Sequence, residues 1–456
     1  MEQLKRSTPV KLTERVLQFG EGNFLRGFVD WMIDRLNKEA GGDYGVVVVQ
    51  PLPQGMIPEL NGQEGLYTLY LRGLLDGKPT EETRVVECIT RGIDPYQDTE
   101  GFFACAANPE LRFIVSNTTE AGIEYKSGQR EGDFAHSTFP GRLAMFLKRR
   151  YDLGLNGFIL FPCELIDKNG DELKECVLKY AADWGYGEGF VKWVLEENHF
   201  TNTLVDRIVT GYPRDDAEKM EKAFGYHDKM IDTAEIFHLW VIEGDRQYAE
   251  EIPFHQLGLN VLWTDDVTPY KKRKVRILNG AHTMMVLAAR LAGLETVREA
   301  MEDEQVFAFA RKGIYEEIIP TLGPSKHKTE QFADDVIERF KNPFINHYLL
   351  SIALNSVSKF KVRVLPSILG YMEEYKKEPE CLVFSLAALI LFYRTEEAKD
   401  DEEVLRFIKT AAVKDILSRS DYWGQDLSML LPSVEKYIAM VEKEGIRCVM
   451  QQVAGA

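Results

Sequence analysis

The sequence predicts an α/β domain with a mainly parallel sheet, followed by an all-helical domain. Three observations support this fold class. Short β-rich runs alternate with helical patterns over the first part of the chain, a glycine-rich turn follows the first of these runs, and the pattern is helical from about residue 270 onward. We expect the α/β domain to span residues 1–268 and the helical domain to span residues 269–456, with their seam in the polar stretch 264–269.

The elements of the first domain are defined by apolar runs and by the turns between them. The expected strands are residues 15–19, 46–49, 67–71, 84–89, 113–115, 158–161 and 204–209. A helix is expected from Asn23 to about Asn37, because its apolar residues recur with helical spacing. Strands 67–71 and 84–89 are separated by Asp76-Gly77 and Pro79, which predicts an antiparallel excursion from the parallel sheet.

The second domain shows helical periodicity in several separate segments. The expected helices are residues 281–291, 304–318, 332–340, 350–359 and 434–444. The longest apolar run, residues 381–393, is too short to span a bilayer and is expected to form a buried helix.

Composition limits the partners of the protein. The 456 residues are 45% hydrophobic and 28% charged, as in ordinary globular proteins. A formal net charge of −17 disfavours nucleic acid and anionic membranes as main partners. Six scattered cysteines form no CxxC pair, which fits a reducing compartment and offers no zinc-site spacing. We therefore expect a cytoplasmic protein without a metal site and with neither nucleic acid nor membrane as its main partner; its oligomeric state, monomer or small homo-oligomer, is left open by the sequence.

The turn after the first strand has the features of a Rossmann-like dinucleotide site. Gly20 and Gly22 let the backbone approach a pyrophosphate, and the helix that starts at Asn23 offers it free N–H groups. Arg26 is expected near the same anion. The third glycine of the usual motif is replaced by Leu25, so the motif alone is weak, and a glycine-rich turn without a ligand is the alternative.

Further cofactor and substrate contacts are expected at the ends of other strands. The second strand ends in Val49-Gln50-Pro51, with no acidic residue for a ribose and no arginine for a 2′-phosphate, so this position does not choose between NAD and NADP. Asn117 and Thr118 are candidates for hydrogen bonds to a ribose, and Glu164 for contact with substrate hydroxyls. Turn chemistry or helix capping is the alternative for each of these three residues.

Lys274, Asn279 and His282 form the candidate catalytic group. A base, an amide and an imidazole within nine residues can stabilise a developing alkoxide. At about 100° per residue of α-helix, Asn279 lies about 140° and His282 about 80° round the helix from Lys274. All three polar tips can then point into one cleft. A solvated helix start with a basic run, residues 271–276, is the alternative.

Two other charged groups have alternative interpretations. Asp206-Arg207 interrupts an apolar run and is either a structural ion pair or a contribution to a ligand cleft. Lys359, Lys361 and Arg363 alternate with apolar residues and form either a solvated face or a site for an anionic substrate.

Two of these motifs together resemble the polyol-specific long-chain dehydrogenase/reductase family, whose best-known member is mannitol 2-dehydrogenase. The first motif is Gly20-Glu21-Gly22-Asn23-Phe24-Leu25-Arg26, and the second is the spacing Lys274, Asn279, His282. Longer blocks are similar to one branch, the tagaturonate reductases (altronate oxidoreductases). These blocks are residues 17–26, 116–123, 162–167, 204–215 and 277–282, and the resemblance extends from about residue 15 to at least 370.

The resemblance implies a metal-independent, NAD-linked interconversion of a keto-uronate and an aldonate. It implies that Lys274 is the general acid/base, that Asn279 polarises the carbonyl and that His282 contacts the reacting oxygen. It also implies that Asp206 and Lys359 line the substrate pocket, and that Phe24 belongs to the cofactor motif.

The chain departs from the mannitol branch at two substrate-facing positions. It has Ser351 where that branch has an arginine and Leu165 where that branch has an asparagine. Mannitol or fructose is therefore not expected as the preferred substrate.

Fructuronate reductase or another polyol dehydrogenase is the alternative within this family. A nucleotide-binding sensor without catalysis and a dinucleotide-dependent isomerase or epimerase are alternatives from other classes.

Overall fold

The computed structural model describes residues 1–9, 11–119, 121–323 and 326–455. It divides into two compact units. The first contains residues 1–72 and 80–267, and the second contains residues 73–79 and 268–456. The tip of a hairpin, residues 73–79, thus groups with the helical residues, which the sequence analysis did not anticipate. Among the described residues, none of the helices combines the length and the apolar character needed to cross a bilayer.

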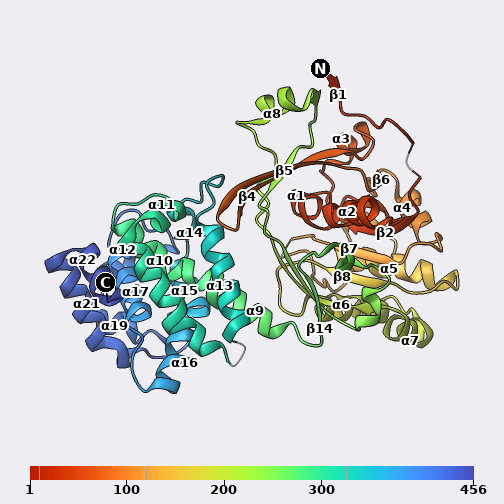
Figure 1. Cartoon of the computed structure of the whole chain (residues 1–456). Helices are drawn as coiled ribbons and strands as arrows, with labels where there is room; N and C mark the ends of the chain where they lie inside the picture. The colour runs from red at the N-terminus through yellow and green to blue at the C-terminus, as the bar shows by residue number, and fades with distance from the viewer. Residues whose placement is uncertain (10, 120, 324–325, 456) are drawn as a thin grey trace. The chain divides into compact units, whose positions relative to one another are not determined.

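The first unit is built on a six-stranded, fully parallel sheet (Figure 1). Its strands are, in spatial order, β6 (Ile89–Ile93), β3 (Gly45–Val49), β2 (Glu14–Phe19), β7 (Phe113–Ser116), β8 (Ile159–Pro162) and β9 (His199–Phe200). This order reverses beside β2, which is the topology of the Rossmann fold, and it places ligands at the carboxyl ends of the central strands. The predicted fold class is confirmed.

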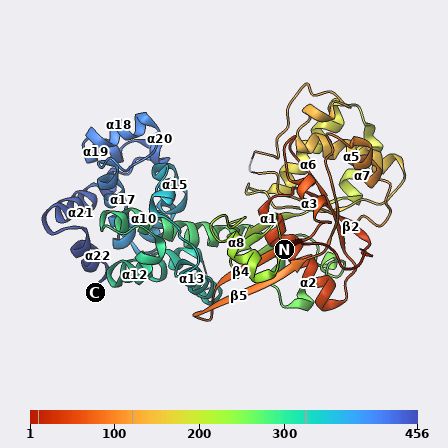
Figure 2. The same cartoon turned by 90° about the horizontal axis from the view of Figure 1, so that it is seen from above.

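Helices cover both faces of this sheet because its apolar residues alternate between two cores. On one face, Val16 and Val46 pack with Phe28 and Trp31 of the first helical segment. On the other face, Leu17 and neighbouring strand residues pack with α4, α5 and α6. Figure 2 shows α2 on one side of β2, and α5 and α7 on the other. The helices of this unit are α1 (Asn23–Leu25), η1 (Arg26–Asp30), α2 (Trp31–Ala40), α3 (Ile57–Gly62), α4 (Thr99–Cys105), η2 (Phe134–His136), α5 (Phe139–Asp152), α6 (Asn169–Asp183), α7 (Gly187–Glu197), α8 (Ala217–Phe224), η3 (Arg246–Ala249) and η4 (Phe254–Leu257).

Three smaller sheets complete the strands. They comprise β1 (Glu2–Gln3) with β11 (Tyr226–His227); β10 (Asn202–Asp206), β13 (Leu239–Glu243) and β14 (Val261–Thr264); and β12 (Asp232–Ala234), β4 (Tyr67–Leu75) and β5 (Lys78–Val86). The hairpin of β4 and β5 confirms the expected excursion. Its turn residues Asp76 and Gly77 both have positive φ, 53° and 72°, as the tight hairpin turn requires.

The second unit consists of helices. They are α9 (Thr268–Lys274), η5 (Val275–Asn279), α10 (Gly280–Leu291), α11 (Val297–Glu302), α12 (Glu304–Lys312), η6 (Gly313–Ile318), η7 (Ile319–Leu322), α13 (Lys326–Phe340), α14 (Leu349–Ile352), α15 (Ser356–Arg363), α16 (Leu365–Tyr375), α17 (Glu380–Tyr393), α18 (Glu402–Thr410), α19 (Val413–Leu417), α20 (Ser420–Trp423), η8 (Ser428–Leu430), α21 (Leu431–Glu444) and α22 (Ile446–Ala454). Apolar all round, α17 is buried among α10, α21 and α22, which confirms the buried helix expected at residues 381–393.

Three expected elements differ from the structure. Residues 84–89 are not one strand, since β5 ends at Val86 and β6 starts at Ile89 as an edge of the parallel sheet. Residues 204–209 do not extend that sheet, because β10 ends at Asp206 and runs antiparallel to β13. The helix expected at residues 350–359 is interrupted between α14 and α15, where Asn355 has a left-handed φ of 53°. Apolar periodicity cannot locate such breaks because it continues across them.

Candidate functional site

The glycine turn lies at the carboxyl end of β2 and has the shape that a pyrophosphate requires. Gly20 has a φ of 125°, and a Cβ built on it would lie 3.0 Å from the carbonyl oxygen of Asn117. A Cβ on Gly22 would meet nothing within 4 Å, so the turn is open on that side. Gly22 caps the helix that starts at Asn23 without a side-chain hydrogen bond, which leaves its first N–H groups available. These residues fit a dinucleotide.

Arg26 and Asn23 hold the shape of this turn. The Arg26 side chain is buried and donates from Nε to the carbonyl oxygen of Glu21, from Nη1 to that of Met230 and from Nη2 to Oδ1 of Asn23. Phe24 is half-buried and stacks on Phe28. The guanidinium therefore serves the protein's own backbone, and direct contact of Arg26 with an anion stays a prediction.

The structure brings Asn117, Thr118 and Glu164 together at the carboxyl ends of β7 and β8. The Glu164 carboxylate accepts hydrogen bonds from Ser116 Oγ, Thr118 N and Thr118 Oγ1, each at 3.0 Å. Burial raises the pKa of Glu164, and these hydrogen bonds act in the opposite direction. Asn117 donates from Nδ2 to the carbonyl oxygen of Cys163 at 3.1 Å. Glu164 thus fixes the loop that carries Thr118, and its contact with substrate hydroxyls stays a prediction. Glu120 of this loop lies outside the described residues.

Glu21 is a feature of the turn that the sequence analysis missed. The residue is 7% exposed. Its carboxylate lies near the side chain of Gln50 at the end of β3, because a Cβ built on Gly55 would meet an oxygen of each side chain. The sequence carries one signal for it, an acidic residue between the two glycines of the turn.

The sequence left two alternatives for Asp206-Arg207, a structural ion pair or a contribution to a ligand cleft, and Arg207 has a structural role. Asp206 is the last residue of β10 and is buried. Arg207 donates to the carbonyl oxygens of Glu235 and Gly27 and stacks on Trp31 with a distance of 4.2 Å to the ring centroid. Arg207 is therefore a structural residue of the first unit, and the substrate role of Asp206 stays a prediction.

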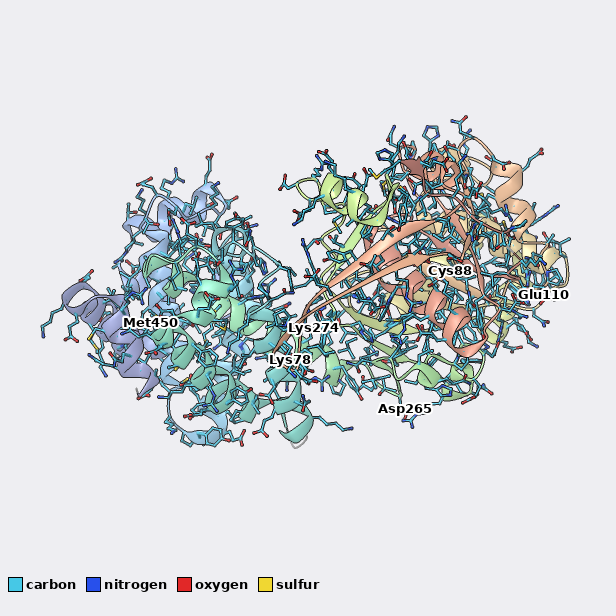
Figure 3. All side chains as sticks on the ribbon, turned by 45° about the horizontal axis from the view of Figure 1, so that its top comes forward. Lys78, Cys88, Glu110, Asp265, Lys274 and Met450 are labelled. Carbon is cyan, nitrogen blue, oxygen red and sulfur yellow. The ribbon has the colours of Figure 1, made fainter. Side chains whose placement is uncertain are left out.

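In the second unit, the candidate catalytic residues lie on a helix that contains a π-helical turn. Lys274 ends α9, the π-turn η5 covers Val275–Asn279, and His282 lies in the first turn of α10. A π-turn takes about one more residue than an α-turn, which removes about 100° of rotation. Asn279 then lies about 40° and His282 about −20° round the axis from Lys274. The angles of about 140° and 80° expected for an α-helix are thus corrected, and the three residues share one face. Figure 3 shows Lys274 at the edge of the helical unit.

His282 is a buried imidazole with an unused nitrogen. Its ring stacks on Phe340 with centroids 4.0 Å apart and meets His347 edge-on at 5.1 Å. Burial lowers its pKa well below the usual value, with further contributions from His347, Arg339 and Arg363. Its Nε2 atom is buried and has no hydrogen-bond partner in the described part of the chain. A neutral imidazole with a free nitrogen can exchange a hydrogen bond with a ligand oxygen.

The neighbouring helix α15 adds positive charge next to His282. Lys359 donates to the carbonyl oxygen of Ile352 at 2.8 Å, and burial together with Arg363 lowers its pKa. Arg363 is half-buried, which lowers its pKa, and its guanidinium has no hydrogen bond or ion pair within the described ranges. The backbone of Arg363 lies against α10, because a Cβ on Gly280 would be 3.1 Å from its carbonyl oxygen. Arg363 thus adds positive charge close to His282, and Lys359 lies on the same helix. The contact of Lys359 with a substrate stays a prediction.

Arg276 lies in the π-turn but away from this face. Its Nη1 donates to Ser367 Oγ of α16 at 3.1 Å, and burial lowers its pKa to about 10. Two residues after Lys274, it lies on another side of the helix, where its guanidinium contacts α16. Arg276 is therefore a poorer candidate for the substrate anion than Arg363.

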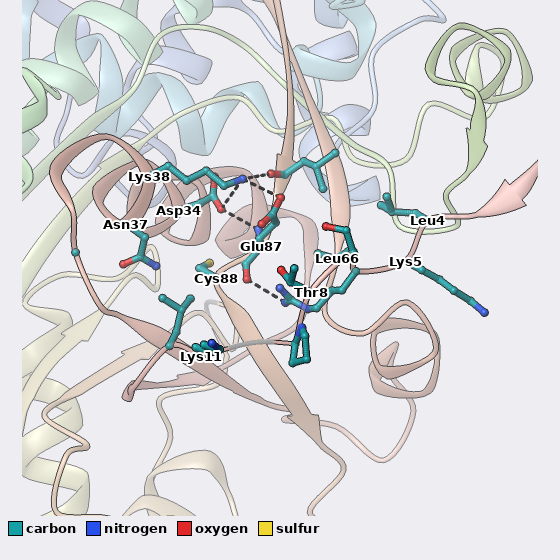
Figure 4. Close-up of a pocket in the computed structure, with 16 residues that line it drawn as sticks. Leu4, Lys5, Thr8, Lys11, Asp34, Asn37, Lys38, Leu66, Glu87 and Cys88 are labelled. Atoms are coloured by element: carbon teal, nitrogen blue, oxygen red, sulfur yellow. Dashed lines mark hydrogen bonds and ion pairs between the residues drawn. The ribbon is translucent and has the colours of Figure 1, made fainter.

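A separate pocket of about 400 Å³ lies in the first unit, far from the glycine turn (Figure 4). Its walls include Leu12, Gly42 and Cys88, which precede β2, β3 and β6, so it opens at the amino ends of these parallel strands. Lys38 in its wall donates to the carbonyl oxygen of Val85 and pairs with Asp34 and Glu87. Dinucleotides bind at the opposite edge of such a sheet, so this pocket is not the cofactor site.

No group of three His, Cys, Asp or Glu side chains among the described residues is arranged to hold a metal ion. The thiol of Cys163 is fully buried, which raises its pKa well above the usual value. This cysteine is a packed thiol.

Comparison with known proteins identifies relatives of both units. Residues 14–256 match the mannitol dehydrogenase Rossmann domain family, and residues 266–442 match the mannitol dehydrogenase C-terminal domain family. The altronate oxidoreductase of Escherichia coli O7:K1 is 46% identical over 447 residues, which cover 93% of this chain and 92% of that protein. The altronate oxidoreductase of Shigella flexneri is 46% identical over 448 residues, with the same coverage of each chain.

Two solved structures share the fold. D-sorbitol dehydrogenase in substrate-free form has a TM-score of 0.83 at 24% identity, covering 96% of this chain and 95% of its own. The Pseudomonas fluorescens mannitol 2-dehydrogenase, solved as a ternary complex with NAD and D-mannitol, has a TM-score of 0.72 at 22% identity and covers 99% and 96%.

Proposed function

Because this chain belongs to the mannitol dehydrogenase family, we propose that it is an NAD-dependent oxidoreductase that interconverts D-tagaturonate and D-altronate. The altronate oxidoreductases that are 46% identical to it support this substrate. We assign dinucleotide binding to residues 1–268, and substrate binding and catalysis to residues 269–456. Lysine acid/base chemistry without a metal is part of the proposal.

One observation supports an acidic substrate over a neutral one. The face that holds Lys274, Asn279 and His282 is flanked by Arg363, which has no acidic partner in the described parts of the chain. A half-buried guanidinium without a carboxylate is costly, because burial disfavours the charged form. A substrate carboxylate would remove this cost and form charge-assisted hydrogen bonds. A neutral polyol would leave the cost in place.

The chain's own residues account for the proton chemistry. Bound NADH supplies the hydride for reduction, and NAD accepts it in oxidation. Lys274 donates a proton to the oxygen of the ketone as it becomes an alcohol, and accepts that proton in the reverse direction. The side-chain amide of Asn279 has no hydrogen bond among the described residues, so it is available to donate to the same oxygen as negative charge develops.

His282 orients the reacting oxygen without competing for the proton. Its lowered pKa keeps the imidazole neutral near pH 7, so it does not act as a second acid. Stacking on Phe340 fixes the plane of the ring, which directs its unpartnered Nε2. A hydrogen bond from this nitrogen costs little reorganisation during the reaction because the ring is already placed.

The test is the rate of NADH oxidation with tagaturonate by Lys274→Ala. We expect turnover to fall by several orders of magnitude, on the order of 10³-fold or more, with NADH binding retained. Lys272→Ala is the matched control, since Lys272 is an exposed member of the same basic segment. Near-normal turnover of Lys274→Ala would refute the lysine mechanism.

Fructuronate reductase is the second candidate, because the same cations fit any keto-uronate carboxylate. Rates with tagaturonate, fructuronate and fructose separate the two reductases from a polyol dehydrogenase. A sensor would oxidise NADH with none of them, and an epimerase would convert a keto-uronate without net oxidation of NADH.

A further inference from the structure

In a Rossmann sheet, the adenosine ribose of a dinucleotide is bound at the carboxyl end of the second strand, which is β3 in this chain. The residue there is Gln50, and no acidic or basic residue stands beside it in sequence. In the structure, however, the neighbouring β2 ends in the glycine turn at the same edge of the sheet. Phe19 is paired with Val49, and Gly20 N donates to the carbonyl oxygen of Val49 at 3.0 Å. The turn residue Glu21 is therefore close to the end of β3.

Two acceptor oxygens meet at this point. A Cβ built on Gly55 would lie 2.2 Å from Glu21 Oε1 and 2.4 Å from Gln50 Oε1, so both oxygens lie close to the backbone of the exposed Gly55. The Gln50 amide donates from Nε2 to the carbonyl oxygen of Leu52 at 2.8 Å, which turns its oxygen away from that partner. Gln50 Oε1 is buried and has no hydrogen-bond partner within the described ranges.

The carboxylate of Glu21 is only loosely satisfied. The backbone N–H of Met56 donates to Glu21 Oε1 at 3.4 Å, and burial raises the pKa of the carboxyl group. A pair of buried acceptors without a donor between them is unfavourable, because each has lost water without a full replacement. A ligand that brings two hydroxyl donors to this place would satisfy both oxygens.

We propose that Glu21 and Gln50 accept hydrogen bonds from the 2′- and 3′-hydroxyls of the adenosine ribose, and that Glu21 thereby makes the protein selective for NAD over NADP. This inference rests on the proposed dinucleotide function. In NADP the 2′-hydroxyl is replaced by a phosphate, which has only acceptor oxygens near pH 7 and is repelled by a carboxylate.

The nearby cations are not available to compensate a 2′-phosphate. Arg26 is committed to backbone oxygens of Glu21 and Met230 and to Asn23. Arg142 donates to the carbonyl oxygens of Pro51, Phe134 and Ala135. Both guanidinium groups thus hold loops of the protein, and the carboxylate of Glu21, with that of Asp94 close enough to act on it, makes the local charge negative.

Gly55 contributes by lacking a side chain. The exposed loop 52–55 passes over the two oxygens, and a methyl group at Gly55 would displace them. Gly55→Ala is therefore an independent way to move the Glu21 carboxylate without changing its charge.

The experiment measures dissociation constants of NADH and NADPH by fluorescence titration of the full-length protein, without substrate. The proteins compared are wild type, Glu21→Gln, Gly55→Ala and Glu110→Gln. The last is a charge-matched control, because Glu110 is exposed and lies before β7, at the opposite edge of the sheet. We expect wild type and Glu110→Gln to prefer NADH. In Glu21→Gln the ratio of the NADPH to the NADH dissociation constant should fall at least about tenfold.

Gly55→Ala should lower this ratio in the same direction, which covers the case that Glu21→Gln does not fold. An unchanged ratio in whichever of the two variants folds, with NADH binding intact, would overturn the role of Glu21 and leave the proposed function standing. Failure of wild type to bind either dinucleotide would overturn both.

Discussion

Replacement of Arg363 by methionine tests whether the protein recognises an acidic substrate. The change removes a guanidinium that has no protein partner in the described parts of the chain, so it breaks no ion pair. Methionine keeps a long unbranched side chain at this half-buried position at the end of α15. The effect on the enzyme should therefore come from the substrate carboxylate and not from the fold.

The magnitude follows from the contacts that would be lost. Hydrogen bonds that involve a charged group contribute roughly 1.5–3 kcal/mol each. Solvent screening weakens the two hydrogen bonds that a half-exposed guanidinium can donate to a carboxylate. We therefore take about 2–4 kcal/mol for the whole contact. At about 1.4 kcal/mol per tenfold, kcat/KM for tagaturonate should fall between about 30-fold and 1000-fold. Most of the loss should be in KM, because the carboxylate is bound equally before and during hydride transfer.

The assay compares tagaturonate with tagatose, the same ketose with a neutral end. Arg363→Met should lower kcat/KM for tagatose by less than about threefold, and Arg363→Lys should recover part of the activity on tagaturonate. Lys361→Met is the control, since it removes one positive charge from the same helix two residues away. Equal losses with both ketoses, or an equal loss in Lys361→Met, would refute a specific contact between Arg363 and the carboxylate.

Two further predictions concern stability and metal dependence. Burial raises the pKa of Asp232 to about 7 in the folded protein, whereas the pKa of an unfolded aspartate is about 3.9. Between these two values the folded carboxyl group still holds its proton and the unfolded one has lost it. Up to about 4 kcal/mol of folding stability that is present below about pH 4 is therefore lost as the pH rises toward 7. The free energy of unfolding of the full chain, measured in urea, should therefore rise for Asp232→Asn relative to wild type between pH 5 and pH 8. A difference in unfolding free energy between the two proteins that does not change with pH would contradict this prediction. Activity after dialysis against EDTA should equal that of the untreated enzyme, and loss of activity that zinc or magnesium restores would refute the metal-independent mechanism.

Much of the first unit could be predicted from its sequence because buried parallel strands leave a strong signal. Continuous apolar runs at residues 46–49 and 113–115 correspond to β3 and β7, and Asp76-Gly77 marks the hairpin turn. These features depend on neighbours in the chain. The division of residues 84–93 into β5 and β6 does not depend on neighbours in the chain, because β6 is defined by its pairing with the distant strand β3.

The polar site residues were harder to predict because their partners are distant in sequence. Arg26 had the spacing of an anion contact, yet its Nη1 donates to the carbonyl oxygen of Met230, 204 residues away. Glu164 had the position of a substrate ligand, yet its carboxylate holds Thr118 from the neighbouring loop. A sequence shows which polar groups are available, but a buried group is satisfied by whichever partner the fold brings to it.

The π-turn brings Lys274, Asn279 and His282 to one face of the helix, as the proposed mechanism on a single oxygen requires. In an α-helix, a lysine and an asparagine five positions apart lie on different sides, and residues that share a face are three or four apart. The π-turn over Val275–Asn279 makes the five-residue spacing equivalent to a single turn. The arrangement also has an energetic cost, because π-turns are rare and pack less well than α-turns. In the proposed mechanism the lysine, the amide and the imidazole converge on one oxygen, which is a reason for the helix to tolerate that cost. A change of sequence that restored α-helical geometry over residues 275–279 without changing their number would rotate Lys274 away from Asn279 by about 100°.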